Sequence, residues 1–133
     1  MKQDAYLILQ MVAEADRALS RWADYVSRDQ LFELGRDPAV VGRIEQELEQ
    51  LYRQLGELGG RMKPGLTPMQ QARYYYAARG ELQKTTTLLR DIRLRNQGSA
   101  RFTAHFLSQA ESCRYTLHQW ASLLQKTAST HLH

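Results

Sequence analysis

The sequence is poor in residues that interrupt helices and in residues that cross-link chains. It contains three prolines, eight glycines and a single cysteine, Cys113, so no disulfide can form within the chain. Extended runs of β-branched residues, which are typical of strands, are missing, while the good helix formers Leu, Ala, Gln, Glu and Arg dominate. The composition therefore predicts an all-α protein from a reducing, intracellular compartment.

Long apolar runs are missing as well. The apolar run nearest the N-terminus, residues 6–9, is too short for the core of a signal peptide. No stretch of the sequence approaches the roughly 20 apolar residues that are needed to span a bilayer. A chain of 133 residues is long enough to bury a real core. We therefore expect one soluble, cytoplasmic helical domain over residues 1–133, with no membrane insertion.

Charge is distributed unevenly along the chain. The net charge of +4 combines an acidic excess in residues 1–58 with a larger basic excess in residues 59–133. One interpretation is that the acidic half folds back on the basic half. The other is that the basic half attracts an acidic or nucleic-acid partner.

Apolar residues in the N-terminal part recur with the alternating three- and four-residue spacing of a coiled-coil seam. This spacing predicts a first helix over residues 4–34, which Gly35 and Pro38 should end or kink. The residues of the seam are Ala5, Ile8, Val12, Ala15, Leu19, Trp22 and Val26.

A second helix is predicted over residues 38–58. Asp37 is suited to cap its first turn, and Pro38 fits the first helical position. A Leu-rich stripe follows, and the Gly-Gly pair behind it should end the helix and open a loop over residues 59–67.

A third seam keeps its seven-residue phase on both sides of the Asn-Gln-Gly-Ser stretch at residues 96–99. A turn would normally reset this phase, so the pattern predicts one continuous helix over residues 68–126. The alternative is a turn at Gly98, which would give separate helices near residues 68–96 and 99–126.

The predicted fold is an all-α, extended antiparallel bundle of three to four long helices with coiled-coil-like packing, followed by a frayed tail over residues 127–133. Two shorter helices cannot cover the full length of a helix over residues 68–126. The apolar residues left uncovered would need a second copy of the chain or a client helix. The candidate partner-binding residues are Phe102, Phe106, Leu107, Leu117, Trp120 and Leu124.

The sequence offers no candidate catalytic, cofactor-binding or metal-ligating site. It contains no glycine-rich phosphate loop, nucleophile elbow or paired-cysteine metal motif. None of the four histidines forms a helical His-x-x-x-His or Glu-x-x-His pair, and Cys113 falls on the seam, where a small core residue is expected. We therefore expect a protein that is not an enzyme and uses no cofactor.

Four arginines form the best candidate for a nucleic-acid contact: Arg90, Arg93, Arg95 and Arg101. No exposed aromatic residues are interleaved with them, and they match no known nucleic-acid reader motif. Nucleic-acid binding is therefore ranked below two protein-binding hypotheses.

Residues 88–122, LLRDIRLRNQGSARFTAHFLSQAESCRYTLHQWAS, resemble the C-terminal helix of the FlgN-type flagellar export chaperones. In that family an apolar run leads into a basic stretch and a polar step, and an amphipathic helix with Leu and Phe closes the chain. The N-terminal half is similar in layout, with a long amphipathic helix, an Asp-containing break and a Leu-rich helix. The matching positions are Leu89, Ile92, Arg95, Asn96, Gln97, Phe102, Phe106 and Leu107.

The resemblance implies a small cytoplasmic chaperone of flagellar (type III) export that has no catalytic activity. Such a protein would bind the amphipathic terminal helices of hook-associated proteins and prevent their premature assembly. The alternative hypothesis is a helical adaptor or oligomeric coiled-coil protein unrelated to secretion. Nucleic-acid binding is the third hypothesis.

Overall fold

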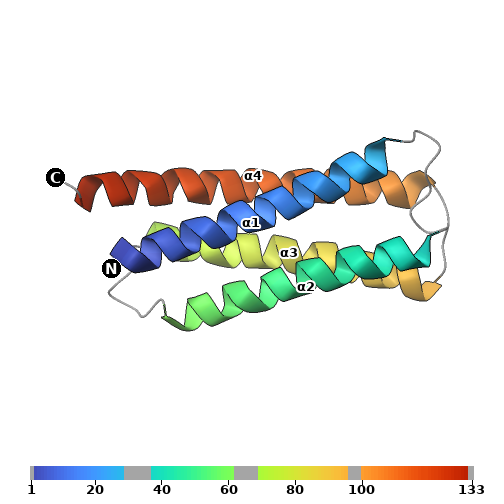
Figure 1. Cartoon of the computed structure of the whole chain (residues 1–133), viewed down its shortest axis with the longest axis horizontal. Coiled ribbons are helices and arrows are strands. Elements are labelled where there is room, and N and C mark those ends of the chain that lie inside the picture. Colours follow the sequence, from blue (N-terminus) through green and yellow to red (C-terminus); the bar gives the residue numbers. More distant parts are fainter. Residues whose placement is uncertain (1, 29–36, 62–68, 96–99, 132–133) are drawn as a thin grey trace.

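The computed structural model describes residues 2–28, 37–61, 69–95 and 100–131. All regular secondary structure in these residues is helical, so the predicted all-α class is confirmed. Consecutive helices run antiparallel, and α1 begins at the end of the molecule where α4 ends (Figure 1). The four helices are α1 (Lys2–Ser27), α2 (Pro38–Arg61), α3 (Met69–Arg95) and α4 (Ala100–His131).

The helices surround one apolar core. α1 and α3 each pack against both α2 and α4, which places the four helices in a closed ring (Figure 1). Every helix contributes fully buried side chains to the centre, among them Leu19, Leu48, Leu82 and Leu117. Burying a leucine side chain contributes about 1.5–3 kcal/mol, so this shared core is the main source of stability.

The first two helices differ from the prediction at their ends. α1 ends at Ser27, earlier than the predicted residue 34, and residues 29–36 lie outside the described part of the chain. α2 starts as predicted, because Asp37 Oδ1 accepts a hydrogen bond of 3.2 Å from the backbone N–H of Val40. It then continues through the Gly-Gly pair to Arg61, since glycine lowers helix propensity without removing the backbone donor.

The continuous helix predicted over residues 68–126 is wrong. α3 and α4 are separate helices that lie side by side, and the rings of Tyr75 and Trp120 are 5.9 Å apart. In one straight helix these two residues would be roughly 67 Å apart. The alternative of two helices is therefore the observed one, and residues 96–99 themselves lie outside the described part of the chain.

The heptad pattern misled because the two helices have the same phase. Ile92 near the end of α3 and Phe106 near the start of α4 are both buried, and they lie two heptads apart in the sequence. Periodicity identifies the face of each helix that is buried, but it does not show that the backbone between them is helical.

The C-terminal end also differs from the prediction. α4 continues to His131, beyond the predicted end at residue 126. The expected frayed tail over residues 127–133 is therefore helical as far as His131, and residues 132–133 are not described.

Candidate functional site

The residues predicted to bind a partner lie in or against the core. Phe102 and Leu107 are partly buried and pack against it. The prediction assumed that the second half of a long helix had no neighbours, but α4 packs on both α1 and α3. Its apolar stripe is therefore covered within the chain, and the assignment of these residues to a partner loses its basis. Four of the six have no exposed surface, namely Phe106, Leu117, Trp120 and Leu124.

The two tryptophans are both buried, as expected for seam residues, but their polar surroundings differ. Trp22 Nε1–H donates a 2.6 Å hydrogen bond to Glu47 Oε2, and the Arg43 guanidinium lies over its ring. Trp120 packs edge-on against Tyr75, and its Nε1–H has no acceptor among the described residues. Trp120 is therefore held by packing alone.

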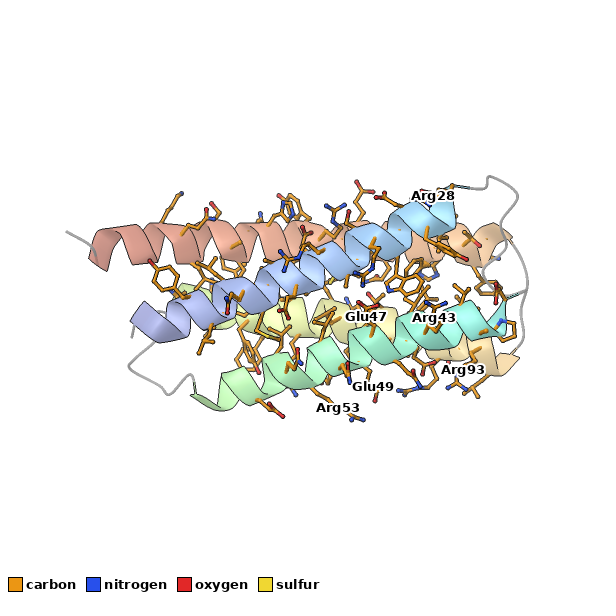
Figure 2. The ribbon with its side chains drawn as sticks, viewed as in Figure 1. Arg28, Arg43, Glu47, Glu49, Arg53 and Arg93 are labelled. Atoms are coloured by element: carbon orange, nitrogen blue, oxygen red, sulfur yellow. The ribbon has the colours of Figure 1, made fainter. Side chains whose placement is uncertain are left out.

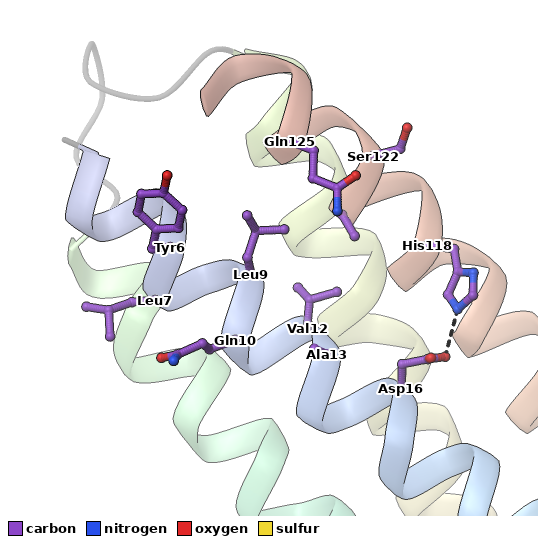
Figure 3. A pocket seen from close by; sticks show the side chains of 11 residues that line it. Tyr6, Leu7, Leu9, Gln10, Val12, Ala13, Asp16, His118, Ser122 and Gln125 are labelled. Atoms are coloured by element: carbon purple, nitrogen blue, oxygen red, sulfur yellow. Dashed lines mark ion pairs between the residues drawn. The ribbon is translucent and has the colours of Figure 1, made fainter. Parts of the chain in front are cut away.

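An open groove lies between α1 and α4, at the end of the bundle where α1 begins and α4 ends (Figure 3). Its volume is about 860 Å³. Small side chains on both helices, Ala13 of α1 and Ala121 and Ser122 of α4, leave the space between them unfilled. The other lining residues are Tyr6, Leu7, Leu9, Gln10, Val12 and Asp16 of α1 and His118 and Gln125 of α4.

The groove is apolar and partly exposed along α1. Val12 and Leu9 pack toward the core, while Tyr6 and Leu7 are 52% and 40% exposed. From Tyr6 to Asp16, the groove follows α1 for about 15 Å, which is the length of roughly three helical turns. Its shape and surface therefore match a short amphipathic helix better than a small polar ligand.

The inner end of the groove is closed by an ion cluster between α1 and α4. Asp16 Oδ1 accepts a hydrogen bond of 2.8 Å from Arg114 Nε. The same oxygen lies 3.0 Å from His118 Nε2 (Figure 3). Burial acts to raise the pKa of Asp16, but the hydrogen bonds from Arg114 and His118 outweigh it and lower the pKa below its ordinary value. The cluster therefore holds a carboxylate that fixes α1 against α4.

A second ion cluster joins α2 to α3. Glu45 is buried, and its oxygens lie 2.8 Å from Arg93 Nε and 3.4 Å from Arg90 Nε. Two arginines of the predicted nucleic-acid cluster are therefore paired with a carboxylate of α2 while their side chains stay half exposed; Figure 2 shows Arg93 at the outer edge of the bundle. Arg101 is exposed, and the side chain of Arg95 is not described.

The described residues contain no arrangement suited to catalysis by a thiol or a metal. Cys113 is fully buried, and burial together with the nearby Glu81 and Asp16 charges raises the pKa of its thiol to about 12. No group of three or more His, Cys, Asp or Glu residues in this part of the chain could hold a metal ion. Nor is any described helix both long enough and apolar enough to cross a membrane.

The lining residues of the groove were not predicted from the sequence. The predicted single long helix placed no residue of the C-terminal region beside the start of the first helix. The contact between these two segments, which forms the groove, could therefore not be predicted. The signal that could have found the groove is the set of small residues beside the seams, Ala13 on α1 and Ala121 and Ser122 on α4. Small side chains facing each other across two helices leave space that nothing in the pair fills.

In a comparison with known proteins, no family model, curated protein or solved structure matches this chain.

Proposed function

We propose that this protein is a non-enzymatic chaperone that binds an amphipathic helix of a client protein in the α1–α4 groove. The observation that carries the proposal is the groove itself, an apolar surface about three helical turns long with Tyr6 and Leu7 exposed at its rim. The clients proposed from the resemblance of residues 88–122 are the terminal helices of flagellar hook-associated proteins.

The physical support for this proposal is that the groove has unfilled apolar space and that an amphipathic helix has an apolar face of suitable size. The amphipathic helices α1 and α4 leave a gap between them that their own side chains do not fill. An amphipathic helix with apolar residues three and four positions apart would fill it and keep its polar face in water. A shallow, solvent-open groove also favours reversible binding, which a chaperone that hands over its client requires.

The test is binding of synthetic peptides that span the terminal helices of hook-associated proteins from the same genome, measured by fluorescence anisotropy. We expect one peptide to bind the purified protein at a one-to-one ratio. Ala13→Arg places a long, charged side chain in the groove and keeps a good helix former at an exposed position. We expect this variant to weaken binding at least about tenfold, since roughly 1.4 kcal/mol of contact is lost.

The matched control is Ala104→Arg, the same exchange at an exposed position near the other end of α4. It should bind like the unmodified protein, and circular dichroism should show equal helix content in all three proteins. The proposal fails if no terminal peptide binds, or if Ala13→Arg binds as tightly as Ala104→Arg. Equal binding of unrelated amphipathic helices would favour the helical adaptor instead.

A further inference from the structure

The α1–α4 groove differs chemically between its two ends (Figure 3). Its outer end is formed by Tyr6 and Leu7, whose side chains carry no charge. Asp16, the one carboxylate among the lining residues, and His118, the one imidazole, lie together at the inner end. A helix bound in the groove would therefore meet apolar surface along most of its length and charged groups at one end.

Arg114 lies one turn of α4 beyond His118, and the chain uses its guanidinium only in part. It donates one hydrogen bond, from Nε to Oδ1 of Asp16. Within the described part of the chain, the Nη1 and Nη2 groups of Arg114 have no acceptor, and the side chain is 38% exposed. Arg93 is different, because both its Nε and its Nη2 donate to the carboxylate of Glu45. Arg114 therefore keeps donors for a second carboxylate.

Among the described residues, no carboxylate other than Asp16 pairs with Arg114. Glu111, one turn before Arg114 on α4, is exposed and makes no ion pair with a described residue. The charge of Asp16 is itself matched by the guanidinium. The inner end of the groove therefore presents hydrogen-bond donors without a surplus of negative charge from this ion cluster.

We propose that the client helix carries an acidic residue at one end of its apolar stripe and that Arg114 binds this carboxylate through its Nη groups. The inference rests on the function proposed for the groove and adds the chemistry of the partner. Apolar side chains of the client fill the space at Ala13 and Ala121, and the carboxylate lies just beyond His118. Because the lining residues of the outer end are uncharged, the acidic residue also determines which end of the stripe lies at the inner end.

The test uses three designed amphipathic peptides of about 18 residues, each with an apolar stripe about three turns long. They differ only at the ends of the stripe: the first has Glu after it, the second has Glu before it, and all other end positions have Gln. We expect one of the two Glu peptides to bind about three- to tenfold more tightly than the Gln peptide in fluorescence anisotropy, which is the scale of an ion pair with a partly exposed guanidinium. Added salt should reduce this preference.

Arg114→Gln separates binding of the client's charge from the structural role of Arg114. Loss of the bond to Asp16 acts on all the peptides alike, so it cancels in the ratio of the affinities for the Glu and Gln peptides. We expect this ratio to fall to about one in Arg114→Gln. Asp16→Asn should raise it, since a negative charge beside the bound carboxylate is removed. The matched control is Arg53→Gln, which removes an exposed, ion-paired arginine of α2 and should leave the ratio unchanged.

The inference fails if neither Glu peptide binds more tightly than the Gln peptide, or if the preference survives in Arg114→Gln. The function proposed for the groove stands in both cases, provided that Ala13→Arg weakens binding of the Gln peptide. If no peptide binds, or if Ala13→Arg leaves every peptide bound, the proposed function fails and the inference fails with it. A dimer in sedimentation that Ala13→Arg splits would place a second copy of the chain in the groove and overturn both.

Discussion

Among single residues, Glu45 has the charge that matters most to the packing of α2 on α3. Its side chain is 8% exposed, whereas those of Arg90 and Arg93 are 48% and 40% exposed. The hydrogen bond from Arg93, partly offset by burial, lowers the pKa of Glu45. Because the native state favours the carboxylate, the stabilisation is present above the ordinary pKa of 4.5 and is lost as the pH falls through the lower, native value.

We therefore expect Glu45→Gln to destabilise the protein by about 1–2 kcal/mol at pH 7, which is the scale of a hydrogen-bonded charge pair whose cations remain half in water. As the pH falls below 4.5 and through the lowered pKa of Glu45, the carboxylate becomes protonated in the unmodified protein as well, so the difference should shrink. Urea unfolding at a series of pH values measures it.

Other carboxylates, Asp16 among them, titrate in both proteins, and so the difference between the two isolates Glu45. A difference in the free energy of unfolding that stays constant as the pH is lowered from 7 through the whole acid range would mean that Gln disturbs packing and that the charge contributes little.

At the scale of helices, three of the glycines inside α2 and α3 have different surroundings: Gly42, Gly56 and Gly80. A side chain added at Gly42 or Gly80 would meet nothing within 4 Å. We expect Gly42→Ala and Gly80→Ala each to raise the free energy of unfolding by about 0.5–1 kcal/mol, because alanine loses less backbone entropy on folding. Thermal and urea unfolding of each variant would check this.

Gly56→Ala is the contrasting variant. Its new carbon would lie 3.1 Å from Arg79 Nη2, and that guanidinium is held over the ring of Tyr52. The gain in helix propensity should therefore be reduced or cancelled by displacement of Arg79. Equal stabilisation by Gly56→Ala and Gly42→Ala would show that Arg79 moves aside at no cost.

The helices and their buried faces could be predicted from the sequence, because both follow from local chemistry. The seam of α1 from Ile8 to Val26 is buried, and Asp37 caps α2. The break between α3 and α4 could not be predicted in the same way. It depends on the burial gained when α4 folds back on α1 and α3, which is a contact between distant segments and leaves no trace in the periodicity.

The α1–α4 groove could not be predicted from the sequence for the same reason. It exists only because residues near Ala13 and residues near Ala121 face each other across two helices that lie far apart in the sequence. Exposed positions on a single helix follow from its own periodicity, and the outward-facing Tyr76, Leu94 and Tyr115 are 66–68% exposed. A site formed by one helix can be inferred from its pattern, whereas a site formed by two requires their pairing.

For the molecule as a whole, the uneven charge of the sequence contributes to the arrangement of the bundle. The acidic half supplies α1 and α2, and these pack on α4 and α3 of the basic half. Asp16 and Glu45 each cross that division to pair with cations. The interpretation that the two halves fold on each other is therefore confirmed.

The closed ring of helices also predicts how the molecule unfolds. Each helix packs on two others around one core, so removing any helix exposes the core residues of its neighbours. We expect a single two-state transition in urea. The smallest of the four helix–helix interfaces is the one between α1 and α2. Trp22 of α1 donates a hydrogen bond to Glu47 of α2, so its fluorescence should change when this interface separates. Trp120 of α4 packs on Tyr75 of α3, so its fluorescence should change when the interface between α3 and α4 separates.

Two variants, Trp22→Phe and Trp120→Phe, each keep one tryptophan, so the fluorescence of Trp120 and of Trp22 can be measured separately. Within each variant, the fluorescence transition should have the same midpoint as the loss of helix followed by circular dichroism, even though the two variants differ in stability. If α1 could detach from α2 while the rest stayed folded, the fluorescence of Trp22 in the Trp120→Phe variant would change at a lower urea concentration than the helix signal. That result would replace the single core by a stable α2–α3–α4 unit with a separable first helix, and it would mean that the α1–α4 groove can open by loss of one wall.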